Sequence, residues 1–75
     1  MENTNQAKHD IVSLLSAIYG DSVGNFFQSR HSNELIPLFV HNSYVLLKQN
    51  LGEYKASEQL DLILSKHGVS VASYD

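Results

Sequence analysis

Apolar residues recur at helical spacing from the first turn of the chain onward. Between residues 6 and 19 they fall on one face of a helix. The members of this face are Ala7, Ile11, Leu14, Leu15 and Ile18. Thr4 or Asn5 can cap the start of this helix, and Gly20 follows its end. The pattern predicts a helix over 6–19, preceded by frayed polar residues 1–5.

A second, shorter helix is predicted over 22–30. Asp21 stands where an N-cap is expected, and Val23, Phe26 and Phe27 repeat at the spacing of a buried face. Gly24 lies inside this helix and lowers its propensity by about 1 kcal/mol relative to Ala. The second helix is therefore the weakest of those predicted.

The third predicted helix, over 34–51, is the most apolar part of the chain. Ser32 and Asn33 provide a start signal, and Pro37 is tolerated in a first turn, where amides lack helical partners. Its apolar residues form a broad face, and Leu38 and Val45 flank that face. We expect this helix to be central, and three short neighbours would not cover it entirely. The surplus apolar surface indicates an interface.

The fourth helix is predicted over 54–67, with Gly68 as its terminator. Residues 69–75 alternate between apolar and small polar types, which suits either a short strand paired across a dimer or a loose end. An isolated strand has no local partner, so a loose tail over 69–75 is the preferred interpretation. The whole chain, 1–75, then forms a single all-α domain, a small bundle of four helices.

The length of the chain makes self-association attractive. A chain of 75 residues without cysteine buries little core and cannot form a disulfide. Pairing with a second copy is one of the few remaining ways to stabilise it, so we expect a homodimer. No apolar leader and no run long enough to span a bilayer is present, which favours a cytoplasmic protein that does not enter membranes.

Leu38, Phe39 and Val45, flanked by His41, are the residues we expect at the dimer interface. The expected function is that of a non-catalytic regulatory or protein–protein interaction module. A second copy of the chain is the expected partner, and a helix of another protein is the alternative occupant of the same surface.

A helix-turn-helix DNA-binding regulator is the alternative function. The second and third helices have suitable lengths, and Arg30, His31 and Asn33 could contact nucleic acid. However, five Lys and Arg stand against eight Asp and Glu, and the basic residues are scattered. Binding to nucleic acid usually needs a basic face. We therefore expect nucleic acid to be an unlikely partner.

Residues for catalysis or for holding a cofactor are not evident. The chain lacks cysteine, and no two of its four histidines stand closer than ten residues, whereas zinc sites use closely spaced pairs. No Gly-x-Ser-x-Gly nucleophile motif and no glycine-rich phosphate loop occurs. We expect no enzymatic activity, no metal and no cofactor.

Overall fold

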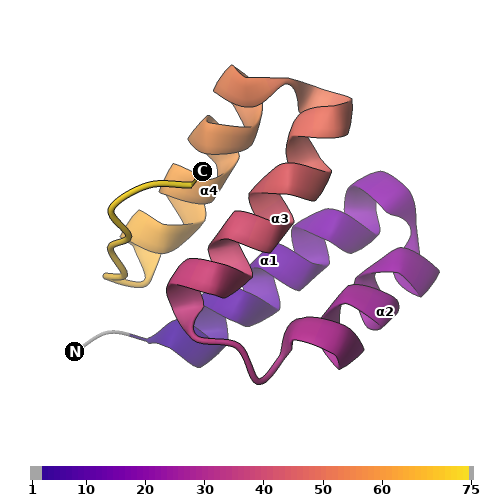
Figure 1. Ribbon diagram of the computed structural model, residues 1–75, viewed down its shortest axis with the longest axis horizontal. Coiled ribbons are helices and arrows are strands. Elements are labelled where there is room, and N and C mark those ends of the chain that lie inside the picture. The colour runs from indigo at the N-terminus through magenta and orange to yellow at the C-terminus, as the bar shows by residue number, and fades with distance from the viewer. Residues whose placement is uncertain (1–2, 75) are drawn as a thin grey trace.

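The computed structural model describes residues 3–74, and in this part of the chain it contains four α-helices and no strand. The helices are α1 (Thr4–Tyr19), α2 (Asp21–His31), α3 (Ile36–Leu51) and α4 (Glu53–Lys66) (Figure 1). The all-α class and the four-helix bundle predicted from the apolar pattern are confirmed. Each predicted boundary lies within two residues of the observed one.

The start of α1 differs from the prediction because the cap lies further upstream. The side chain of Asn3 accepts a hydrogen bond from the amide of Gln6, at 3.3 Å, and thereby caps the helix. Thr4 and Asn5 are consequently helical and are neither caps nor frayed residues. The predicted fraying of residues 1 and 2 lies outside the described residues.

The start of α3 also differs, because the polar residues ahead of it stabilise a turn. Leu35 has an extended backbone and precedes the helix, and Pro37 lies in its first turn. The amide of Glu34 donates to the carbonyl of His31, at 3.0 Å, while the ammonium of Lys8 donates to the carbonyls of Ser32 and Glu34. Lys8 of α1 thus holds the turn between α2 and α3 in place.

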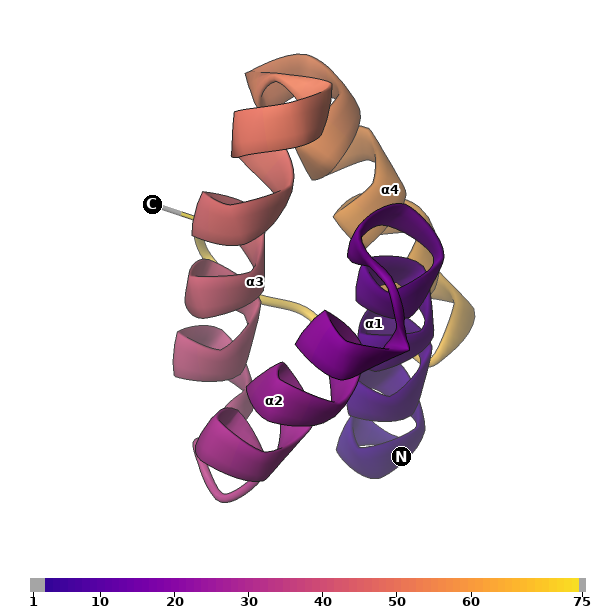
Figure 2. The ribbon, with the colours of Figure 1, turned by 90° about the vertical axis from the view of Figure 1, so that its right-hand side faces the viewer.

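The helices form two hairpins, α1–α2 and α3–α4, joined by contacts of α1 with α3 and α4 (Figures 1 and 2). The sequence pattern predicts the third helix as the central one. In the structure α1 packs closely against all three other helices, whereas α3 packs closely only against α1 and α4. An edge-to-face contact between the rings of Phe27 and Phe39, with centroids 5.1 Å apart, links α2 to α3.

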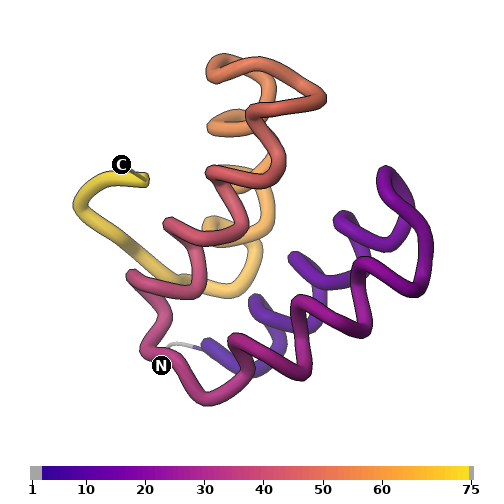
Figure 3. The backbone as a smooth tube through the Cα atoms, turned by 45° about the vertical axis from the view of Figure 1, so that its right-hand side comes forward, coloured from indigo at the N-terminus to yellow at the C-terminus, as the bar shows by residue number. Residues whose placement is uncertain are grey.

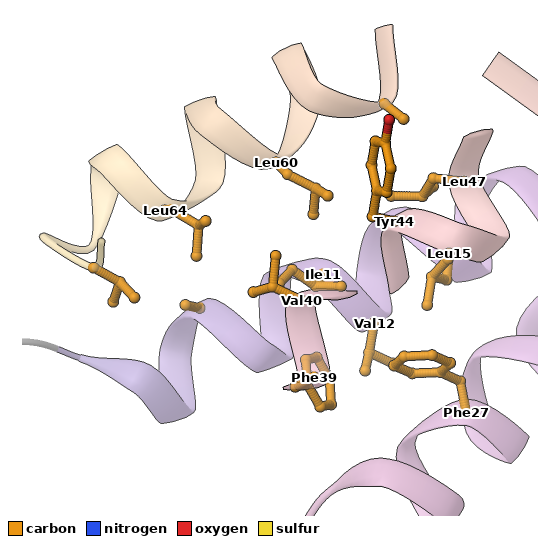
Figure 4. Packing of buried hydrophobic residues seen from close by; sticks show 13 residues of the cluster. Ile11, Val12, Leu15, Phe27, Phe39, Val40, Tyr44, Leu47, Leu60 and Leu64 are labelled. Atoms are coloured by element: carbon orange, nitrogen blue, oxygen red, sulfur yellow. The ribbon is translucent and has the colours of Figure 1, made fainter. Parts of the chain in front are cut away.

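The core lies where α1, α3 and α4 meet, and Phe27 extends it toward α2 (Figure 4). The largest fully buried apolar side chains are Ile11 and Leu15 from α1, Phe39, Val40 and Leu47 from α3, and Leu60 from α4. Their burial supplies the main stabilising term of the fold.

Gly24 permits the close crossing of α1 and α2. A Cβ atom at this position would lie 1.9 Å from the Oγ of Ser16 and 3.1 Å from its Cβ. The glycine that weakens α2 locally thus suits the tertiary packing, because a Cβ atom at this position would crowd the side chain of Ser16 on α1.

The tail after α4 is packed against the body of the protein and is not loose. Val69 is buried, and its amide donates to the carbonyl of Leu64 at 2.9 Å. Val71 and Tyr74 are partly buried against the core. Residues 69–74 are therefore not a loose end, and they form no strand within this chain; pairing of a strand across a dimer stays a prediction, and Asp75 lies outside the described residues.

Candidate functional site

Four of the six large apolar side chains that are exposed within residues 3–74 lie along one continuous stretch of the chain, on the surface of α2, the turn after it and α3. We call this surface the α2–α3 face and define it by Phe26, Leu35, Leu38 and Val45. Their exposed fractions are 66% for Phe26, 81% for Leu35, 50% for Leu38 and 37% for Val45. Single exposed apolar residues are normal, but a group of four on adjoining elements is typical of an interaction surface.

α2 and α3 diverge away from their shared turn (Figure 3), and a hollow lies between side chains of these two helices. The hollow measures about 330 Å³. Its walls come from one stripe of α2 and one stripe of α3, with Val23, Phe26 and Arg30 on the first and Asn42, Val45 and Gln49 on the second. The hollow therefore offers both apolar and polar groups to a side chain of a binding partner.

The same segment carries very little charge. Between residues 22 and 47 the only Asp, Glu, Lys or Arg residues are Arg30 and Glu34. Depletion of charge together with exposed aromatic and aliphatic side chains distinguishes the core of protein interfaces from other protein surfaces. By contrast, α4 alone carries five of the thirteen Asp, Glu, Lys and Arg residues of the chain.

Glu34 forms a polar cluster at the end of the α2–α3 face that is nearest the turn. The ring of His31 donates from Nδ1 to one of its carboxylate oxygens, at 3.0 Å, and the amide of Asn42 donates to the other at 2.9 Å. The pKa of Glu34 lies below its ordinary value, mainly because its carboxylate accepts the hydrogen bond from His31. These bonds join the end of α2, the turn and α3.

Of the residues predicted at the interface, the structure places only Leu38 and Val45 on the α2–α3 face. Phe39 is 1% exposed and belongs to the core, so its assignment to an interface is wrong. His41 is partly buried on another side of α3, where its Nδ1 lies 2.8 Å from the carbonyl oxygen of Tyr74. Each residue of a helix is rotated by about 100° from the one before it, so the side chains of Leu38, Phe39 and His41 leave α3 in different directions.

Sequence reasoning missed Phe26. Its spacing with Val23 and Phe27 predicts burial, but α2 buries only Gly24 and Phe27. The missing signal is that α2 has a single close neighbour, α1, so only one narrow stripe of α2 can be covered. The sequence pattern likewise includes Leu35 in the third helix, although the structure places it in the turn before α3.

The residues predicted for nucleic-acid contact lie close together at the end of α2 without forming a basic patch. Arg30 and Asn33 are exposed. His31 bonds to Glu34 and packs its ring against Phe27, with centroids 4.5 Å apart. The carboxylate of Glu34, which is bonded to His31 beside these residues, opposes the approach of phosphate.

A second pair of a histidine and a carboxylate joins the end of α4 to α1. Nε2 of His67 donates to the carboxylate of Asp10 at 2.7 Å, and the ammonium of Lys66 lies 3.6 Å from the same oxygen. The bond from His67, followed by the charge of Lys66, lowers the pKa of Asp10. This pair connects residues 57 positions apart in the sequence.

Within residues 3–74, no group of three or more His, Cys, Asp or Glu side chains is placed to hold a metal ion. None of the four helices combines the length and apolar character that crossing a bilayer requires. Comparison of the chain with models of protein families, with curated proteins and with solved structures finds no match.

Proposed function

We propose that this protein is a small interaction module that pairs with a second copy of itself through the α2–α3 face. The observation that carries the proposal is the exposure of Phe26, Leu38 and Val45 on a segment with almost no charge. Leaving such a surface in water is unfavourable, at about 25 cal/mol for each Å² of apolar area. Its burial against a partner supplies the driving force for association.

A second copy of the chain suits this surface better than a charged partner. Glu34 is engaged with His31 and Asn42, which leaves Arg30 as the one charge on the face that has no such partner among the described contacts. The complementary surface must therefore be apolar and nearly uncharged, and the same face of another copy has these properties. Twofold pairing of identical surfaces is also the commonest form of protein assembly.

The size of the molecule is compatible with such a dimer. A stable interface buries about 800 Å² on each partner. The accessible surface of the whole chain is 4718 Å², so pairing would cover about one sixth of it. Pairing also adds apolar burial to a chain whose own core is small, and it makes stability depend on protein concentration.

Sedimentation equilibrium of the wild type and two matched variants tests the proposal. We expect the wild type to sediment with twice the mass of the chain, and Val45→Asp to sediment with the mass of one chain while keeping its helical circular dichroism. Leu62→Asp is the control, because Leu62 is an equally apolar, exposed residue on α4 outside the face. A monomeric wild type at millimolar concentration, or equal masses for both variants, would contradict the proposal.

The alternative function, DNA binding by α2 and α3, remains a prediction with a separate test. A gel shift with mixed-sequence DNA at low salt, where phosphate contacts are strongest, detects even non-specific binding. We expect none, since Arg30 is the only Lys or Arg on α2. A gel shift that is seen with the wild type and is lost in Arg30→Ala would favour DNA binding over the proposed interaction module.

A further inference from the structure

Residues 69–74 run back from the end of α4 across α3 and α4 (Figures 1 and 2). Gly68 has a φ of +67°, which lets the chain reverse direction after the helix. The buried Val69 then anchors the segment through its amide bond to Leu64. We call residues 70–74, which follow this anchor, the strap.

Tyr74 attaches the far end of the strap by three different contacts. Its carbonyl accepts a hydrogen bond from Nδ1 of His41 at 2.8 Å. Its ring packs against the ring of Tyr44, with centroids 5.7 Å apart and planes inclined by 32°. Its hydroxyl donates to the carboxylate of Asp61. His41 and Tyr44 belong to α3 and Asp61 to α4, so one residue of the strap bridges both helices.

The chemistry of this attachment defines what the surface recognises. Burial, followed by the hydrogen bond to Asp61, raises the pKa of Tyr74, so its phenol stays protonated and continues to donate. Val71 places a second apolar side chain against the body three residues before Tyr74. The surface therefore accepts an extended segment with an apolar residue and, three positions later, a tyrosine.

The attachment covers little of the strap itself. Ser70, Ala72 and Ser73 are exposed, and Val71 and Tyr74 are only partly buried. A segment with so little buried area opens at a lower free energy than the whole domain unfolds. By contrast, the helices beneath it keep Val40, Leu60 and Leu64 buried in the common core. The strap can leave while the bundle stays folded.

We propose that the strap is a displaceable self-ligand that occupies a peptide-binding surface on α3 and α4. The partner is an extended segment of another protein that carries the same pattern, an apolar residue followed three positions later by tyrosine. The strap blocks this surface in the free protein, and a segment that competes for Tyr44, His41 and Asp61 takes its place. The surface lies apart from the α2–α3 face and does not depend on dimerisation.

A fluorescent peptide with the sequence of residues 69–74 and blocked ends tests this proposal on full-length variants. In the wild type the strap competes with the peptide. In Tyr74→Ala the strap loses the ring contact with Tyr44 and the hydroxyl bond to Asp61, so we expect the peptide to bind this variant at least tenfold more tightly. Tyr54→Ala is the control, because Tyr54 is an exposed tyrosine of α4 with no described contact to the strap. Its peptide affinity should equal that of the wild type.

Further arms keep the test decisive. A peptide with alanine in place of its tyrosine should not bind Tyr74→Ala. If Tyr74→Ala fails to fold, Tyr74→Phe retains the ring and loses only the hydroxyl, and it should show an intermediate gain. Val45→Asp should bind the peptide as the wild type does, whether or not dimerisation occurs. Equal peptide affinity in the wild type and the Tyr74 variants, or no binding to any of them, would overturn the proposal.

Discussion

Substituting Gly24 by Ala has two opposite effects on stability, a gain in helix propensity and a loss in packing. Ala has a higher helix propensity than Gly, which by itself stabilises a helix interior by about 1 kcal/mol. In this protein, however, the added Cβ would lie 1.9 Å from the Oγ of Ser16 and 3.1 Å from its Cβ. A rotation of the Ser16 hydroxyl relieves the first contact, but the second needs a movement of α1 away from α2.

The expected net effect of Gly24→Ala is destabilisation. Inserting a methyl group into a close-packed contact costs about 1–3 kcal/mol. Subtraction of the propensity gain leaves a net loss of about 1 kcal/mol in the free energy of unfolding. With a urea dependence of about 1 kcal/mol per molar for a chain of this size, the unfolding midpoint should fall by about 1 M. Circular dichroism at fixed protein concentration measures this midpoint.

Two controls make the result interpretable. Ser29→Ala changes an exposed position of the same helix and should alter the stability by less than about 0.5 kcal/mol. In a Ser16→Gly background the clash is absent, so Gly24→Ala should become stabilising by about 1 kcal/mol. A higher urea midpoint for Gly24→Ala in the wild-type background would refute the argument that close helix packing requires this glycine.

Three further predictions follow from the structure. Gly52→Ala should lower the free energy of unfolding by about 1–3 kcal/mol, as measured by urea denaturation. Gly52 has φ +85° and ψ 166°, a backbone conformation that is open almost only to glycine. The loss would come from the backbone alone, because a Cβ atom at this position would have no neighbour within 4 Å. Leu60→Ala should cost about 2–5 kcal/mol in the same assay while Leu62→Ala changes little, since Leu60 is buried and Leu62 is exposed on the same helix. The carboxyls of Asp10 and Glu34 have pKa values lowered from 3.8 and 4.5, so their contribution to stability is complete above these values and is lost as the pH falls below them. The double variant Asp10→Asn/Glu34→Gln should therefore have a lower free energy of unfolding than the wild type at pH 7, and it should lose less of it on acidification to pH 3. If the free energies of unfolding of the two proteins fall in parallel with pH, these two carboxyls do not contribute to the pH dependence of stability.

The sequence predicted that α3 carries an exposed apolar surface, but it did not predict correctly all the residues that form this surface. Leu38 and Val45 flank an already broad apolar face, so helical geometry alone turns them away from the core. Phe39 looks equally apolar in the sequence, and only the position of α1 and α2 places it inside. Phe26 shows the reverse error, because its burial depends on how many helices surround α2.

The local physics of the chain determined the four helices, since apolar spacing and the glycines after α1, α3 and α4 act over a few residues. The tertiary structure alone decided that α1 contacts all other helices, that Gly24 serves a close crossing, and that the tail docks through Tyr74. These features join residues far apart in the sequence, as with His41 and Tyr74 or Asp10 and His67. Periodicity describes which side of one helix is apolar, whereas the partner of that side depends on how the helices pack together.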